Sequence, residues 1–157
     1  MLDTLPPTAR RVEQNSDPAI NEAIRERTDA EVVRLEGASD EEIAQRLREL
    51  DREWDVERTL QANASVLAMA GVLLGAKVNR WFLLLPAAVF SFLGNHALQG
   101  WCPPIPLFRR MGVRTQREIE RERYALKALR GDFDPVPPAG AAPEGERVRA
   151  VLRAIDR

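Results

Sequence analysis

The sequence contains few residues suited to redox or metal chemistry. Among its 157 residues there is one cysteine, Cys102, and one histidine, His96. A single cysteine excludes an intramolecular disulfide. One histidine and one cysteine also fall short of the three or four protein ligands that zinc takes. We therefore expect no metal and no cofactor, and we expect no nucleic acid as a partner.

The N-terminus has no long apolar segment. Residues 1–11 lack the apolar region of a secretory signal peptide. Residues 1–16 include Pro6 and Pro7 and show no apolar periodicity, so we predict that they are disordered. If the protein enters a membrane, we expect its insertion signal to lie farther along the chain.

Charge is nearly absent from the centre of the chain. Residues 60–76 carry none, and residues 81–108 carry none if His96 is neutral. The hydrocarbon core of a bilayer is ~30 Å thick and needs roughly 20 apolar helical residues, with a lower limit near 17. We predict an all-α protein built on a two-span transmembrane helical hairpin over residues 59–115.

The alternative is a soluble helical bundle in which the two apolar segments form the core. A mean hydropathy of -0.32 and a charged content of 30% favour this alternative. However, a core helix of a soluble protein normally keeps a polar face. Residues 83–85 and 87–90 show none. We therefore prefer the membrane interpretation.

Small residues recur at helical spacing in both apolar segments, which favours close helix packing in lipid. We expect the two stripes to pack the hairpin against itself, with a homodimer contact as the alternative. The first stripe is Ala64, Ala68, Gly71 and Gly75, and the second is Ala87, Ser91 and Gly94.

Orientation follows from the lysines and arginines beside the spans. The loop between the spans has two, Lys77 and Arg80, whereas four arginines stand in residues 46–58 and six in residues 109–123. We therefore predict a multi-pass membrane protein with both termini in the cytoplasm.

A polar patch of Asn95, His96 and Gln99 lies near the far end of the second segment. Polar groups at membrane depth are often functional, and a histidine there can relay protons. These three lie within about two turns of the interface, where water and headgroups can also satisfy them.

Cys102 is the one candidate reactive residue. The nearby Arg109 and Arg110 favour a lowered thiol pKa. No catalytic base is evident, so we prefer the interpretation that Cys102 is a small buried residue where a helix meets a turn. We identify no catalytic residue.

The segment before the hairpin, residues 17–58, is predicted to be an acidic helical arm. One helix begins near Pro18 and ends before Gly37. A second begins with a capping box, Ser39 and Glu42, and a continuous helix from there into the first span is one alternative. Its narrow apolar seam is suited to a neighbouring helix, to the bilayer surface or to a dimer partner. The seam consists of Ile43, Leu47, Leu50 and Trp54.

The segment after the hairpin contains further helices. Thr115 and Glu118 form a capping box that begins an amphipathic basic helix over residues 116–131, suited to an anionic leaflet or to the acidic arm. Residues 132–143 are a linker rich in proline and alanine. Residues 144–157 are predicted to form a short amphipathic helix that folds against membrane or a protein partner.

The order of the hairpin, a Gly-x-Cys-Pro motif and a later Gly-Val-x-Thr motif resembles the YgaP-like transmembrane domain over about residues 55–115. The positions that carry the resemblance are Gly100, Cys102, Pro103, Gly112, Val113 and Thr115. The resemblance implies a two-span bacterial inner-membrane module. The sequence differs from the family's usual pattern in two ways. Ile105 stands where the family often has an aromatic residue, and the interval between Cys102 and Gly112 is longer. No rhodanese loop is present, so sulfur-transfer chemistry is not implied.

These observations predict a non-enzymatic membrane anchor or scaffold in the bacterial inner membrane. Its expected partners are the lipid bilayer, a second copy of the chain in a dimer, and a protein of unknown identity that binds the helical arms. Two alternatives belong to other functional classes. One is a thiol-dependent redox or sulfur-relay component that uses Cys102, and the other is an oligomeric permeation path for small solutes.

Overall fold

The structure is a computed structural model that describes residues 6–143 and 145–156. Within these residues the chain is all-helical, and no β-strand is present. The predicted disorder of residues 1–5 and the two ends of the predicted C-terminal helix, residues 144 and 157, lie outside the described residues.

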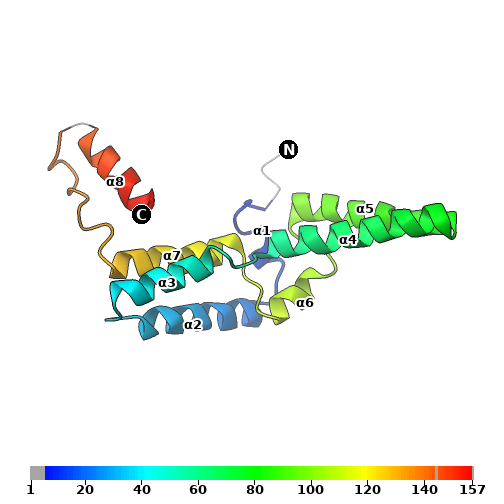
Figure 1. The fold of residues 1–157 in the computed structure, drawn as a ribbon, viewed down its shortest axis with the longest axis horizontal. Coiled ribbons are helices and arrows are strands. Elements are labelled where there is room, and N and C mark those ends of the chain that lie inside the picture. The colour runs from blue at the N-terminus through cyan, green and yellow to red at the C-terminus, as the bar shows by residue number, and fades with distance from the viewer. Residues whose placement is uncertain (1–5, 144, 157) are drawn as a thin grey trace. The chain divides into compact units, whose positions relative to one another are not determined.

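The helices follow one another along the chain with the labels of Figure 1. They are α1 (Arg11–Gln14), α2 (Pro18–Arg34), α3 (Asp40–Leu50), α4 (Val56–Lys77), the 3-10 helix η2 (Arg80–Leu83), α5 (Leu84–Gln99), α6 (Ile105–Arg110), α7 (Gln116–Leu129) and α8 (Glu146–Asp156).

The chain divides into two compact units, each made of two segments that are distant in sequence. Unit 1 consists of Met1–Arg27 and Trp54–Ile119, and unit 2 consists of Thr28–Glu53 and Glu120–Arg157. The boundaries fall inside α2 and α7, so each of these helices contributes to both units.

Unit 1 contains the two apolar helices, α4 and α5, which run side by side in opposite directions (Figure 1). Val56–Lys77 and Arg80–Gln99 are both long and apolar enough to cross a membrane. The side chain of Asn79 accepts a hydrogen bond from the N–H of Trp81 and so begins η2. Pro86 lies in the first turn of α5, where its missing N–H removes no helical bond, so the proline does not interrupt the helix.

The small-residue stripe of α4 faces α5. Gly71 is buried, and a Cβ atom there would lie 2.5 Å from Cδ of Pro86. A Cβ atom at Gly75 would lie 2.6 Å from Cδ2 of Leu83. Ala64 and Ala68 are buried on the same side of α4. These four residues therefore let the backbone of α4 approach η2 and α5 closely.

The small-residue stripe of α5 does not make the expected contact with α4. Ala87, Ser91 and Gly94 are exposed, and nothing lies within 4 Å of a Cβ atom placed on Gly94. The buried positions of α5 are Pro86 and His96. At about 100° per residue, these two positions lie on a different side of the helix from the small-residue stripe. The small residues of α5 therefore face outward together with most of its large apolar side chains, such as Phe90 and Leu98.

The core of unit 1 lies where the apolar helices meet the short helices α1 and α6. It contains Val12, Val56, Leu60, Cys102, Ile105 and Phe108. Val12 belongs to α1, so disorder predicted through residue 16 is wrong for residues 11–14. Burial of this one apolar side chain in the distant core explains the order, since the local sequence has no helical period.

Unit 2 contains α3, whose capping box forms as predicted. The Ser39 hydroxyl accepts a hydrogen bond from the N–H of Glu42, and the Glu42 carboxylate accepts one from the N–H of Ser39. The helix ends at Leu50, and α4 begins at Val56 with Asp55 as its N-cap. The continuous helix considered for this region is therefore absent.

The apolar seam of α3 is buried within the chain at three of its four positions. Ile43, Leu47 and Leu50 are buried, which agrees with packing against a neighbouring helix. Trp54 is 49% exposed and lies beyond the helix end, with the guanidinium of Arg58 at 4.6 Å from its ring.

The basic helix α7 pairs with the acidic arm, which was one of the two predicted alternatives. In unit 2, Arg123 contacts Asp51 at 2.6 Å and Arg121 contacts Asp29 at 2.8 Å. The helix ends at Leu129, shortly before Gly131, whose φ of 79° is readily adopted only by glycine. A segment without regular secondary structure then leads to α8.

Candidate functional site

Cys102 lies in the apolar core of unit 1, and its side chain is only 3% exposed. Burial raises the pKa of the thiol. A reactive cysteine is instead accessible and has a lowered pKa. Arg109, one of the two arginines expected to activate it, is engaged with a carboxylate elsewhere. The surroundings of Cys102 therefore suit a structural residue.

The predicted polar patch separates into three different environments. Asn95 donates from its side chain to the carbonyl of Trp101 at 2.9 Å, which stabilises the chain after α5. The side chain of Gln99 is exposed, while its carbonyl accepts a hydrogen bond from Asn15 at 2.6 Å. His96 is buried and 4% exposed. The three residues do not form one polar surface.

His96 belongs to a charged cluster that joins α1, α4 and α5. Its Nε2 lies 2.8 Å from Oε2 of Glu57, and Oε1 of Glu57 accepts a hydrogen bond from Arg11 at 2.7 Å. A partly buried carboxylate between two basic side chains is stabilised by both. The sequence pattern did not identify Arg11 or Glu57, because they are separated from each other and from His96 by long stretches of chain.

Within the described residues, this cluster has two buried polar atoms without a hydrogen-bond partner, Nδ1 of His96 and Nε of Arg11. A carboxylate that orients an imidazole is a common part of catalytic sites. Here, however, the imidazole is almost inaccessible to solvent, so a substrate could not reach it without movement of the helices. The arrangement is suited to holding α1 against the ends of α4 and α5.

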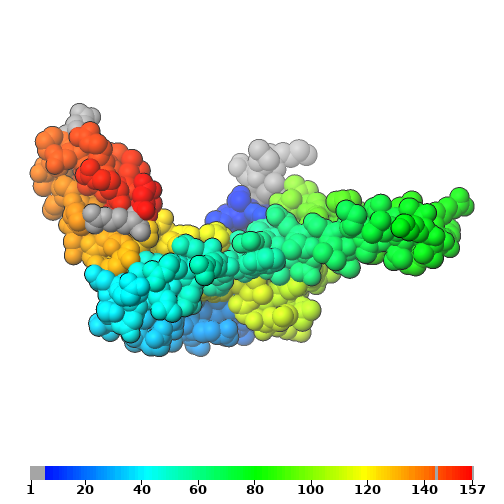
Figure 2. Space-filling view, in the orientation of Figure 1, coloured from blue at the N-terminus to red at the C-terminus, as the bar shows by residue number. Residues whose placement is uncertain are grey.

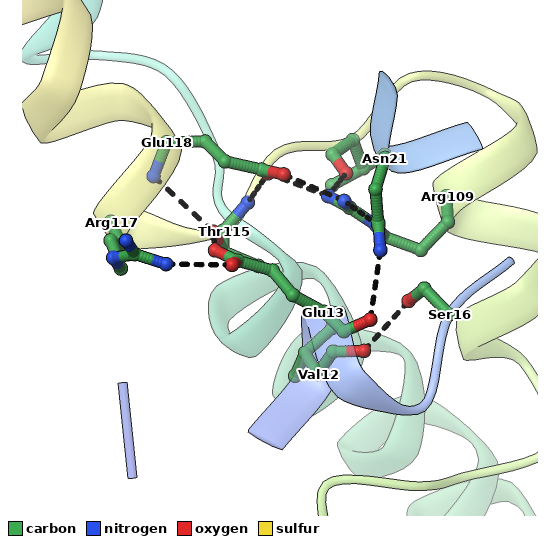
Figure 3. A network of polar contacts seen from close by, with 9 residues as sticks. Val12, Glu13, Ser16, Asn21, Arg109, Thr115, Arg117 and Glu118 are labelled. Carbon is green, nitrogen blue, oxygen red and sulfur yellow. Dashed lines mark hydrogen bonds and ion pairs between the residues drawn. The ribbon is translucent and has the colours of Figure 1, made fainter. Parts of the chain in front are cut away.

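A second polar network surrounds Arg109, which is 1% exposed (Figure 3). The guanidinium donates to both carboxylate oxygens of Glu118, at 2.6 and 2.7 Å. It also donates to Oδ1 of Asn21 at 2.8 Å and to the carbonyl of Val113 at 3.1 Å. These bonds connect α2, α6 and the beginning of α7, so Arg109 is a structural residue of unit 1.

Glu118 also completes the predicted capping box of α7. Its carboxylate accepts a hydrogen bond from the N–H of Thr115 at 2.7 Å, and its own N–H donates to the Thr115 hydroxyl at 3.3 Å. Burial alone would raise the pKa of Glu118. The hydrogen bonds from Arg109 and Thr115 outweigh burial, so its pKa lies below the ordinary value.

Glu13 fastens the N-terminal segment to the same network (Figure 3). Its carboxylate accepts hydrogen bonds from Arg117 at 2.7 Å and from the Thr115 hydroxyl at 3.2 Å. Its carbonyl accepts one from the side chain of Asn21 at 2.8 Å. The segment from Arg11 to Asn21 is therefore hydrogen-bonded both to the ends of α4 and α5 and to the network around Arg109.

The residues that carry the family resemblance have structural roles in this fold. Gly100 caps α5 with φ 79°, and a Cβ atom there would lie 2.5 Å from the backbone of Arg11. Gly112 also has a positive φ, of 84°, and Val113 packs against the core. Thr115 caps α7, and Pro103 lies in the exposed turn before α6. The motif therefore shapes the turns around α6.

The described residues contain no group of three or more histidine, cysteine, aspartate or glutamate side chains that could hold a metal ion. No protein-family model matches the chain, and no curated protein or solved structure matches it significantly. The resemblance to the YgaP-like transmembrane domain therefore remains a prediction from the motif residues.

Proposed function

We propose that the protein is an integral membrane anchor whose α4 and η2–α5 segments span a bilayer as a two-helix hairpin. The observation that carries the proposal is the exposure of the apolar helices. Within the most apolar 18-residue stretch of each segment, only 22% is buried in Val56–Lys77 and 11% in Arg80–Gln99. A core helix of a soluble protein would be mostly buried.

The exposed surface of the pair consists largely of large apolar side chains. In Figure 2, no other part of unit 1 covers the visible face of α4 and α5 at the ends that η2 connects. A soluble monomer rarely exposes contiguous apolar patches beyond a few hundred Å². Lipid is the solvent in which this surface is stable. The exposed apolar side chains of this surface include Val66, Met69, Leu73, Trp81, Leu84 and Phe90.

The ends of the pair are suited to an interface. Lys77, Arg80 and the 69% exposed Trp81 cluster where α4 ends and η2 begins. Lysine and arginine extend to the headgroups, and tryptophan favours the interfacial region. At the other end, Glu57, His96 and Arg11 lie in a charged cluster. The excess of arginine beyond this end favours a cytoplasmic location for both termini.

We assign the protein a scaffold role without enzymatic activity, in the bacterial inner membrane that the family resemblance implies. Two features support this role. The candidate thiol is buried with a raised pKa. The histidine is held against a carboxylate and is almost inaccessible to solvent. Both candidate reactive side chains are used to pack helices.

The first test is fractionation followed by topology labelling. Carbonate-washed membranes should retain the protein until detergent is added. In a Cys102→Ala background, Asn79→Cys should react with a membrane-impermeant maleimide in intact spheroplasts, whereas Ala141→Cys should react only after lysis. Recovery of the protein in the carbonate supernatant would refute a membrane-spanning role, and labelling of both positions before lysis would refute the orientation.

We also propose that the hairpin self-associates through the outward stripe of α5. Ala87, Ser91 and Gly94 are exposed, and the space beside Gly94 is open. In lipid, small residues allow helices of two copies to approach closely. Gly94→Leu should reduce energy transfer between labelled copies in a bilayer. Ala88→Leu, which also enlarges an exposed residue of α5, is the matched control. Equal energy transfer in both variants and the parent would refute this contact.

A further inference from the structure

Helix α8 exposes three of its four large apolar side chains, whereas Val151 is partly buried and both alanines are buried. Val148 is 59% exposed, Leu152 is 55% exposed and Ile155 is 39% exposed. Ala150 and Ala154, by contrast, are 8% and 3% exposed. If α8 contacted only the rest of unit 2, an amphipathic helix of this kind would bury its larger apolar side chains there. The sequence of α8 therefore fits an additional partner on its outer face.

The inner face of α8 is already fixed to unit 2. Nζ of Lys127 donates a hydrogen bond to the carbonyl of Ile155 at 2.5 Å. At the edge of the helix, Nε of Arg147 donates to the carbonyl of Pro137 in the preceding linker at 3.1 Å, while the Arg147 side chain stays exposed. Both bonds use backbone carbonyls, so they leave the aliphatic side chains of the outer face free to contact another surface.

Basic side chains border the exposed apolar face. By helical spacing, Arg147 stands beside one edge of the face and Arg149 beside the other, and both are exposed. The acidic residues of the helix, Glu146 and Asp156, are its first and last residues. A face of aliphatic residues with arginines along its margins is complementary to a layer of anionic headgroups over acyl chains.

The size of this face argues against a second copy of the chain as its occupant. Its aliphatic side chains offer roughly 300 Å² of apolar surface at most. A specific protein interface buries about 800 Å² on each partner. A lipid surface has no such minimum, particularly for a helix that is already held near the bilayer by the same chain.

We infer that α8 docks its Val148–Leu152–Ile155 face onto an anionic membrane surface, with Arg147 and Arg149 at the headgroups. This inference rests on the proposed membrane-spanning function, because the spanning helices tether α8 to the membrane through the same chain. It adds a second membrane contact with a preference for lipid charge. Each arginine near an anionic surface should change the ratio of docked to undocked helix about fivefold.

The experiment uses the full chain with Cys102→Ala, reconstituted into nanodiscs of phosphatidylcholine with or without phosphatidylglycerol. An environment-sensitive NBD label on Val148→Cys reports the apolar face, and the same label on Glu146→Cys is the control for the polar face. The label at 148 should shift to the blue and be quenched by spin-labelled lipid, more strongly with phosphatidylglycerol. Arg147→Gln with Arg149→Gln should lower the docked ratio about 30-fold.

Two results would overturn the inference while leaving the proposed function intact. One is a chain that enters nanodiscs although its label at 148 remains as water-exposed as the label at 146. The other is protection of the label that depends on protein concentration but not on lipid charge, which would assign the face to a second copy. A chain that does not enter nanodiscs at all would refute the proposed function as well.

Discussion

The apolar helix pair and the helices of unit 2 distribute polarity in opposite ways. In the pair, large hydrophobic residues face outward, with Met69 61% and Trp81 69% exposed. In unit 2, charged residues are buried: Glu122 is 0% exposed, and Lys127 and Asp132 are each 7% exposed. Unit 2 also buries apolar residues such as Ile43 and Leu50. The rule that hydrophobic residues lie inside and charges outside therefore fails for the helix pair and has these exceptions in unit 2.

The difference follows from the solvent that each region requires. Burying a charge is tolerable where a partner and hydrogen bonds are present, as for Glu122, whose carboxylate lies 2.7 Å from Arg46. Exposing a long apolar helix is tolerable only where the surroundings are apolar. The proposed membrane-spanning role requires lipid around the helix pair and water around unit 2, and five changes would test or refine this contrast.

The largest effect is expected at a buried charge. Arg109→Met leaves the partly buried Glu118 carboxylate without its bidentate partner. Breaking one side of a buried ion pair costs about 3–5 kcal/mol. The free energy of unfolding, measured by denaturant titration in detergent, should fall by this amount. Arg110→Met alters an exposed neighbour, so it should change stability by less than about 0.5 kcal/mol. An equal effect of both substitutions would contradict the assigned role of Arg109.

A charge in the exposed apolar surface directly tests the surrounding solvent. Met69 lies near the middle of α4 and is 61% exposed. Met69→Arg should oppose membrane insertion by about 2.5–3.5 kcal/mol, as for arginine at a span centre. In water the same substitution would change stability by only about 0.5 kcal/mol. Val78→Arg is the matched control at the end of the span. Insertion can be measured by the fraction of each variant that resists carbonate extraction.

Packing between the apolar helices should be sensitive at Gly71 and tolerant at Gly94. An added Cβ atom at Gly71 lies 2.5 Å from the proline ring of Pro86, so Gly71→Ala must separate α4 from α5. Overpacking of this kind costs about 1–3 kcal/mol. Gly94→Ala meets open space and should not lower the midpoint of thermal unfolding in detergent. Equal loss in both variants would show that the helices do not pack in this register.

Acid should weaken unit 1 through Glu118. Its folded-state pKa lies below the ordinary value of 4.5, so the unfolded state takes up protons first. The stabilisation is fully present above that value and is lost as the pH falls through the folded-state pKa. Unfolding followed from neutral pH through this range should show a smaller pH dependence in Glu118→Gln than in the parent. The same pH dependence of the free energy of unfolding in both proteins would show that Glu118 does not contribute to acid sensitivity.

The smallest effect is expected at a surface ion pair. Arg121 and Asp29 lie 2.8 Å apart, but their side chains are 52% and 48% exposed. Exposed pairs of this kind contribute about 0.2–1 kcal/mol and are screened by salt. Arg121→Ala should therefore lower the free energy of unfolding by less than about 1 kcal/mol, and the difference should shrink further at high salt. If Arg121→Ala lowered the free energy of unfolding as much as Arg109→Met, the exposure of an ion pair would not predict its contribution to stability.

Local signals in the sequence predicted the helices well. The capping boxes of Ser39 and Thr115 begin α3 and α7, and Gly37 follows the end of α2 as expected. The two apolar helices were also predicted, because length and absence of charge are properties of a single segment. The short helices α1 and α6 were missed, since neither shows a periodic pattern.

The roles of individual polar residues could not be predicted in the same way. Arg109 was counted among the arginines that set the orientation and was expected to activate Cys102, yet it is buried against Glu118 and Asn21. His96 was grouped with its neighbours Asn95 and Gln99, yet its partner is Glu57. Each of these pairings depends on which helix faces which, and spacing within one helix cannot specify that.

The sequence by itself determined that the chain is helical, where most helices begin and end, and that two of them are apolar throughout. These properties depend on caps, on glycine and proline, and on residues a few positions apart. Only the tertiary structure decided that Cys102 is buried, that Arg109 and His96 pair with distant carboxylates, and that the small residues of α5 face outward. Those outcomes depend on contacts between segments far apart in the chain, whose geometry is set by packing.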